Sequence, residues 1–203
     1  MLRFDMLWKQ FCVNFLFVFL GVFIPASLCA DHQIQVYRKV PDFNFTERSG
    51  KEMKLSDLKG NIWIANFIFT RCQSACPLLA GQMARFQERL VGPKIKFVSF
   101  SVDPEYDTPD VLSKYAARYG AVENRWFFLT GAKSAMRDFV TQGFLLGIAD
   151  ATPEDLASGA ELVMHSNRFV LVDQDGYIRG YYDSSEPSKM EELVKHTLYL
   201  SGG

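Results

Sequence analysis

The sequence has no excess of charge of either sign. Its 22 lysines and arginines stand against 23 aspartates and glutamates, which leaves a formal net charge of -1. Proteins that bind nucleic acid depend on clustered positive charge to neutralise phosphates, and an acidic tail would show the opposite imbalance. The composition therefore argues against a nucleic acid as partner.

Long apolar runs are also scarce. The run from Phe11 to Ile24 has 14 residues and includes Asn14. A membrane-spanning helix needs about 20 apolar residues, so this run is short for that purpose. The rest of the chain, with 48% hydrophobic and 22% charged residues overall, has the composition of an ordinary globular domain.

An export signal explains the apolar run better. Arg3 and Lys9 precede it, and small residues through Ala30 follow it. A positive segment, an apolar segment and a small-residue cleavage region are the parts of a signal peptide, in that order. We expect residues 1–30 to be a signal peptide or, alternatively, an N-terminal membrane anchor, and residues 31–203 to form one domain.

Cysteine is scarce as well. There are only 4 in the chain, too few for a scaffold held together by disulfides. Cys12 and Cys29 fall in the expected leader, so the exported chain keeps Cys72 and Cys76. Thiols outside the cytosol tend to be oxidised. This pair is therefore the candidate for the chain's chemistry.

Hydrophobic periodicity predicts alternating strands and helices. We expect strands at Ile62–Phe69, Ile95–Val102 and Trp126–Leu129, helices at Pro77–Leu90, from Pro109 onward, at Met136–Phe144 and at Pro187–Leu200, and a hairpin of Arg168–Val172 with Tyr177–Tyr182. This order predicts a layered α/β domain, with a central mixed sheet between helices on both faces and a C-terminal hairpin and helix. Ala149–Val163 has no clear period and is expected to be a loop.

Cys72 and Cys76 stand between the strand that ends at Phe69 and the helix that contains Pro77. The backbone N–H groups and positive dipole end at a helix start favour thiolate, and Arg71 adds a nearby cation. Three intervening residues let both sulfurs face one way or close into a disulfide. Metal binding, redox chemistry and a structural disulfide all stay open on this pattern.

A metal site built on two thiolates needs a further ligand, and the chain has 3 histidines. His165 ends the expected loop, whereas His32 lies next to the expected leader and His196 lies in the last helix. Two thiolates and one imidazole suit Cu(I), while a structural zinc site needs four protein ligands. On the pattern alone, His165 is equally an ordinary surface or core histidine.

Three motifs in order resemble the Sco (SenC) family. They are an apolar strand running into Thr70-x-Cys72-x3-Cys76-Pro77, the segment Val98–Glu105 followed by Asp107-Thr108, and His165-Ser166 before Phe169–Gly176. The resemblance covers nearly all of the chain after the leader and implies a thioredoxin-like fold. It also implies export, to the periplasm, the outer face of the inner membrane or the equivalent intermembrane compartment of an organelle.

The resemblance implies a function and its residues. Members of the family bind copper and help to assemble the dinuclear copper site in subunit II of cytochrome c oxidase, as copper donors, as reductants of its cysteines, or both. By this resemblance Cys72, Cys76 and His165 bind copper, as Cu(I) or Cu(II), and Asp103 is a carboxylate beside the site. Asp103 is equally a turn residue between a strand and a helix.

The resemblance leaves two roles to weigh. The first is delivery of copper to subunit II or to another exported copper protein, with a membrane tether as an option. The second is a thiol-disulfide oxidoreductase that uses Cys72 and Cys76 as a redox pair and delivers no copper.

The chain departs from the family's pattern around its expected ligands. Gln73, Ser74 and Ala75 separate the cysteines where members commonly have a proline and an acidic residue, and Met164 stands where an acidic residue commonly precedes the histidine. Less negative charge weakens the hold on a cation, and an imidazole without a carboxylate partner is less fixed. The ligands themselves are kept.

Overall fold

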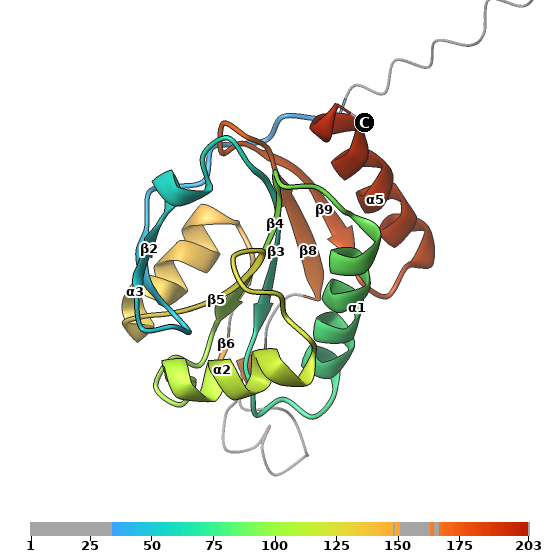
Figure 1. Cartoon of the computed structure of the whole chain (residues 1–203). Coiled ribbons are helices and arrows are strands. Elements are labelled where there is room, and N and C mark those ends of the chain that lie inside the picture. Colours follow the sequence, from blue (N-terminus) through green and yellow to red (C-terminus); the bar gives the residue numbers. More distant parts are fainter. Residues whose placement is uncertain (1–33, 148, 151–162, 165–166, 203) are drawn as a thin grey trace, which may run out of the picture. The chain divides into compact units, whose positions relative to one another are not determined.

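The computed structural model describes residues 34–147, 149–150, 163–164 and 167–202. In chain order it contains β1 (Asn44–Glu47), β2 (Glu52–Lys54), a short 3₁₀ helix (Leu55–Leu58), β3 (Ile62–Ile68), α1 (Ala75–Arg89), β4 (Ile95–Ser101), α2 (Pro109–Arg118), β5 (Trp126–Thr130), α3 (Lys133–Asp138), a π-helical turn (Phe139–Gly143), β6 (Ala149–Asp150), β7 (Val163–Met164), β8 (Arg168–Val172), β9 (Ile178–Asp183) and α5 (Pro187–Ser201). The expected α/β order is confirmed, with small shifts at the ends of elements (Figure 1).

Seven strands form one mixed sheet in the order β2-β1-β5-β4-β3-β8-β9. The three strands β3, β4 and β5 are parallel, and β1, β8 and β9 each pair antiparallel with a neighbour. All seven residues of β3 are buried, since β4 and β8 flank it and helices cover the sheet. A strand that is buried on both faces has a continuous apolar sequence, which is why the position of β3 was predictable.

Helices cover both faces of the sheet. On one face, Phe86 of α1 packs edge to face against Phe169 of β8, and Tyr115 of α2 packs against β5. Helix α5 lies beside α1 on this face (Figure 1). On the other face, Phe139 after α3 packs against Phe100 of β4. The predicted arrangement with helices on both faces is confirmed.

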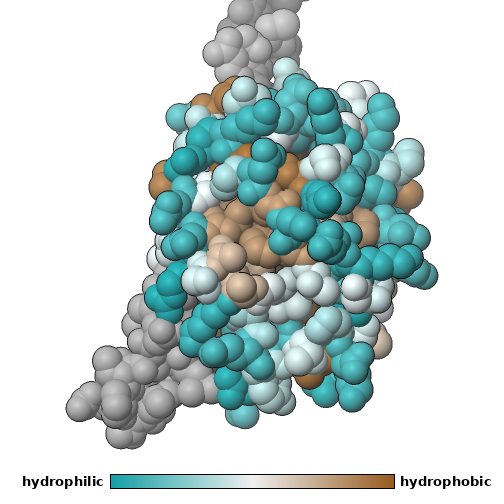
Figure 2. Space-filling model, turned by 90° about the vertical axis from the view of Figure 1, so that its left-hand side faces the viewer, coloured by the Kyte–Doolittle hydropathy of each residue, from teal (hydrophilic) through white to brown (hydrophobic). Residues whose placement is uncertain are grey.

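The face under α3 has an aromatic core. Phe43, Phe67, Phe100, Phe139 and Phe144 pack ring to ring, with centroid separations from 5.0 to 6.0 Å. Figure 2 shows apolar surface in the middle of the side that carries β2 and α3, framed by polar side chains. Such packing holds β3 and β4 firmly beneath the turns that follow their carboxyl ends.

Two parts of the fold differ from the sequence prediction. The hairpin of β1 and β2 was not predicted, because its strands have 4 and 3 residues and one of them buries Glu47. The helix expected at Met136–Phe144 begins earlier, at Lys133, and continues as the π-helical turn. That turn brings the rings of Phe139 and Phe144 to 5.2 Å from each other.

The prediction of a loop over Ala149–Val163 is wrong at both ends, which form paired strands. Ala149–Asp150 pairs antiparallel with Val163–Met164, and residues 151–162 between them lie outside the described residues. The expected leader, residues 1–30, also lies outside them. Of the helices that are described, none is long and apolar enough to cross a membrane.

Candidate functional site

Cys72 and Cys76 lie where β3 turns into α1, as the sequence predicted. Strand β3 ends at Ile68 and α1 begins at Ala75, so Cys72 is in the turn and Cys76 is in the first helical turn. Their exposed fractions are 5% and 0%, and no disulfide joins them. The pair is therefore held inside the protein surface, at the carboxyl end of a buried strand.

Backbone hydrogen bonds connect the two cysteines. The Cys76 N–H donates to Cys72 Sγ at 3.1 Å, and the Phe69 N–H donates to Cys76 Sγ at 3.5 Å. The Cys72 N–H in turn donates to the Phe69 carbonyl at 3.2 Å. The first N–H groups of a helix have no acceptor within the helix, so Cys72 sulfur takes the place of a capping oxygen. Donors aimed at sulfur stabilise negative charge on it.

Tyr115 ties the start of α1 to α2. Its hydroxyl donates to the Cys76 carbonyl oxygen at 3.2 Å. Burial is the main cause that raises the pKa of Tyr115, so the hydroxyl keeps its proton and remains a donor. The backbone of Cys76 is therefore fixed from two sides.

Asp107 anchors the turn that precedes Cys72. Its carboxylate is fully buried and accepts hydrogen bonds from the Thr70 N–H at 3.1 Å, the Thr70 hydroxyl at 2.5 Å and the Ser101 hydroxyl at 2.6 Å. Burial raises the pKa of Asp107, while the hydrogen bonds from Ser101 and Thr70 lower it in part. The loop after β4 is thus tied to the turn after β3.

Arg71 and Asp103 form an ion pair beside the same turn. Arg71 Nε and Nη2 donate to one oxygen of Asp103, at 3.0 and 2.6 Å. The guanidinium also lies over the ring of Tyr106, 4.5 Å from its centroid. The sequence predicted Arg71 as a cation serving the thiolates. In the structure the guanidinium instead pairs with the carboxylate of Asp103, because the loop after β4 lies beside the turn that contains Arg71.

Asp103 fits both interpretations that its position in the sequence allowed. Its carbonyl oxygen accepts from the N–H groups of Tyr106 and Asp107, so its backbone forms the turn between β4 and α2. Its side chain reaches the cysteine turn only through Arg71. Asp103 therefore acts on the charge near the cysteines and also shapes the loop.

The third expected ligand, His165, lies outside the described residues. The backbone of Val163–Met164, immediately before it, pairs with β6. Across the part of the chain that the structure describes, no three histidine, cysteine or acidic side chains are grouped to hold a metal ion. The structure thus brings together Cys72, Cys76 and the Arg71–Asp103 pair.

Sequence reasoning missed the roles of Asp107 and Tyr115. A signal for Asp107 was present, because polar residues that follow two neighbouring parallel strands meet at one edge of the sheet. Tyr115 lies within the helix expected from Pro109 onward, where the sequence pattern gave it no role. A buried tyrosine needs a partner for its hydroxyl, which was the available hint.

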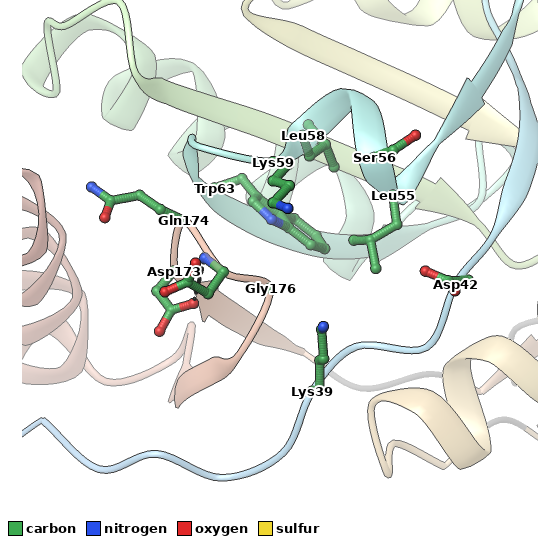
Figure 3. A pocket seen from close by; sticks show the side chains of 11 residues that line it. Lys39, Asp42, Leu55, Ser56, Leu58, Lys59, Trp63, Asp173, Gln174 and Gly176 are labelled. Carbon is green, nitrogen blue, oxygen red and sulfur yellow. Dashed lines mark hydrogen bonds between the residues drawn. The ribbon is translucent and has the colours of Figure 1, made fainter.

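A pocket at the opposite end of β3 is separate from this site. It has a volume of about 200 Å³ and is lined by Lys39, Asp42, Leu55, Ser56, Leu58, Lys59, Trp63, Asp173, Gln174, Asp175 and Gly176. Figure 3 shows Lys39, Lys59 and Asp42 around the ring of Trp63. Trp63 is near the start of β3 and the cysteines follow its end, so the pocket takes no part in their chemistry.

The family comparison covers most of the chain. Residues 31–198 match the SCO1/SenC family. A SCO1 protein homolog from Bacillus subtilis is 34% identical over 178 residues, which are 85% of this chain and 89% of that protein. The similarity therefore spans all three motifs around the site.

Solved structures share the fold. BsSco, described as a member of the Sco family of cytochrome c oxidase assembly proteins with a disulfide switch, is 32% identical, with a TM-score of 0.70 over 83% of this chain and 96% of that chain. ScoI from Bradyrhizobium japonicum, solved with copper bound, is 21% identical, with a TM-score of 0.63 over 80% of this chain and 99% of that chain. The predicted thioredoxin-like fold is confirmed.

Proposed function

Since the chain belongs to the SCO1/SenC family, we propose that it binds Cu(I) through Cys72 and Cys76 and serves the assembly of cytochrome c oxidase. The observation that carries the proposal is the 3.1 Å hydrogen bond from the Cys76 N–H to Cys72 Sγ, which keeps two buried sulfur donors at one helix start. Thiolates are soft ligands that Cu(I) prefers. A structural relative, B. japonicum ScoI, was solved with copper bound.

His165 is the third ligand in this proposal. Two thiolates and one neutral imidazole give Cu(I) a low coordination number with donors that suit it. β7, which pairs with β6, ends at Met164, the residue before His165 in the sequence. Asp103, held by Arg71, is a carboxylate beside the site and influences its charge without binding the metal.

The recipient is subunit II of the oxidase or another exported copper protein. Copper transfer exchanges ligands: the recipient's cysteine thiolates take Cu(I) as Cys72 and Cys76 release it. Reduction of the recipient runs differently. One thiolate attacks the recipient's disulfide to form a mixed disulfide, and the other thiolate displaces the recipient's cysteine, which leaves Cys72 and Cys76 oxidised and the recipient as a dithiol.

A thiol-disulfide oxidoreductase without copper delivery is the second candidate. Cys72 lies in the turn before α1 and Cys76 in the first turn of the helix, so the two thiols are close together. This placement favours the oxidoreductase, because a resolving thiol close to the attacking thiol speeds release of the mixed disulfide. The relative BsSco is described as having a disulfide switch.

The substitution His165→Ala separates the two roles. Copper transfer from the loaded protein to a dithiol peptide of oxidase subunit II is measured beside reduction of the same peptide's disulfide. If the imidazole is a copper ligand, transfer changes about tenfold or more while reduction stays within a few-fold. His196→Gln, on α5, is the control and leaves both unchanged. Equal losses of both activities contradict a ligand role for His165, and no loss of either favours the oxidoreductase.

We also propose that the protein works outside the cytosol, after cleavage near Asp31 or while anchored by its leader. The order of charged, apolar and small residues before Asp31 supports export. N-terminal sequencing of the protein from membrane and soluble export fractions decides between the two forms. A start near Asp31 supports cleavage, an intact Met1 in the membrane supports the anchor, and recovery only from the cytosol contradicts export.

A further inference from the structure

Among the described residues, two of the three groups that donate hydrogen bonds to the buried Asp107 carboxylate belong to a single residue, Thr70. Both the N–H and the hydroxyl of Thr70 donate to it. Thr70 stands two residues before Cys72, in the turn between β3 and α1. Asp107 comes from the loop after β4, so the turn is held from outside its own segment.

The position of this turn decides where the sulfur of Cys72 lies. From Thr70 the chain continues to Cys72, whose N–H donates to the carbonyl of Phe69. The sulfur of Cys72 then accepts the Cys76 N–H at 3.1 Å. A hydrogen bond to sulfur depends on distance and angle, so a small displacement of the turn weakens it.

We propose that Asp107 and Thr70 are positioning residues that set the thiol-disulfide equilibrium of Cys72 and Cys76. The inference rests on the proposed function, in which these two cysteines are redox-active. By fixing the turn, they hold Cys72 sulfur against the Cys76 N–H, a hydrogen bond that stabilises the reduced form. Loosening the turn shifts the equilibrium toward the disulfide.

The redox step balances with glutathione as the partner. The two thiols lose two protons and two electrons as the bond between their sulfurs forms. Oxidised glutathione takes up both and becomes two molecules of reduced glutathione. A protein whose reduced form is stabilised is the stronger oxidant, so loss of the anchor makes the pair more reducing.

Ser101 provides a matched control within the same cluster. Its hydroxyl also donates to Asp107, at 2.6 Å, but it belongs to β4. Ser101→Ala removes one hydroxyl donor from the same carboxylate, together with the acceptor of the Asp103 N–H, and leaves both bonds from Thr70 in place. Thr70→Val removes only the hydroxyl bond next to the cysteine turn and keeps both the Thr70 N–H bond and the Asp107 side chain.

The test is the equilibrium of the full chain in glutathione redox buffers, read as the fraction of disulfide by thiol alkylation and mass spectrometry. For Thr70→Val we expect a shift of about tenfold toward the disulfide, which corresponds to about 30 mV for a two-electron couple. Thr70→Ser keeps the hydroxyl and should stay within about threefold of the wild type. Ser101→Ala should do the same. Thr70→Ala is measured in parallel. It also removes the hydroxyl, so the test still stands if the valine side chain does not fit at this position.

The outcomes separate this inference from the proposed function. If the wild type forms the Cys72–Cys76 disulfide and the Thr70 variants have the wild-type equilibrium, the inference is wrong and the proposed function stands. An equal shift in Ser101→Ala also overturns it, because a general loosening of the cluster then explains the effect. If the wild type forms no such disulfide at any glutathione ratio, the redox part of the proposed function fails.

Discussion

The carboxylate of Asp103 meets the guanidinium of Arg71 through a single oxygen, with Nη2 at 2.6 Å and Nε at 3.0 Å. This pair connects the residue next to Cys72 with the loop that follows β4. A cation that is already balanced adds little net charge to the cysteines. The backbone N–H groups of Phe69 and Cys76, in contrast, donate directly to the two sulfurs.

Removal of the guanidinium should destabilise the loop. Arg71→Met keeps the length of the side chain and leaves the nearly buried Asp103 without its partner. We expect the free energy of unfolding to fall by about 1 kcal/mol, a discounted value because 39% of the Arg71 side chain is exposed to solvent. Urea unfolding measures it. Arg89→Met, which removes the exposed pair with Glu191, is the control and should cost less. If Arg71→Met and Arg89→Met lower the free energy of unfolding equally, the expectation that the pair with the nearly buried Asp103 contributes more than the exposed pair is wrong.

The buried Asp107 should make stability depend on pH. Burial raises its pKa in the folded protein, whereas the unfolded chain has the ordinary value, so the folded protein binds this proton at higher pH. The resulting stability is fully present below the ordinary pKa and is lost as the pH rises through the raised pKa. Relative to Asp107→Asn, the wild type should therefore gain stability as the pH falls through the raised pKa toward the ordinary value of 3.8.

Asp183 supplies a control of opposite sign for this measurement. Hydrogen bonds from Ser185 lower the pKa of Asp183, so its contribution is present above the ordinary pKa and is lost as the pH falls through the lowered value. Against Asp183→Asn, the wild type should lose stability on acidification. Urea unfolding across the pH range tests both. A difference between wild type and Asp107→Asn that is constant with pH would contradict the assignment.

The parts of the fold that could be predicted are those with strong local signals. β3 and β4 are continuous apolar runs, and the strand, turn and helix around Cys72 and Cys76 follow from Pro77 and the helical spacing beyond it. The hairpin turn was also predictable, since Gly176 has a φ of 85° that only glycine adopts easily.

The parts that could not be predicted depend on which strands pair. The bonds from Arg71 to Asp103 and from Thr70 to Asp107 span 32 and 37 residues. They exist because β3 and β4 are parallel neighbours in register, with Ile68 paired to Ser101, so that both following loops meet. A single sequence does not specify that register. The sequence therefore placed Asp107 near the cysteine turn at most, and the structure shows which residue it binds.

Oxidation and copper binding should exclude each other. A disulfide between Cys72 and Cys76 uses the same sulfurs that Cu(I) needs as thiolates. We expect the oxidised protein to take up no tightly bound Cu(I) and to recover full binding after reduction, with mass spectrometry and copper analysis on each form. Cys72→Ser, which cannot form the disulfide, should respond to neither treatment. Full copper loading of the oxidised form would contradict a site built from both sulfurs.

The most direct test of the account is the copper stoichiometry and ligand set of the reduced protein loaded anaerobically with Cu(I). The account predicts one copper per chain, with X-ray absorption at the copper edge that fits two sulfur donors and one nitrogen donor. Cys72→Ser and Cys76→Ser should each abolish tight binding, and His165→Ala should weaken it. A Cys76→Ser variant that binds Cu(I) as tightly as the wild type would contradict the proposal that this pair of cysteines is the copper site.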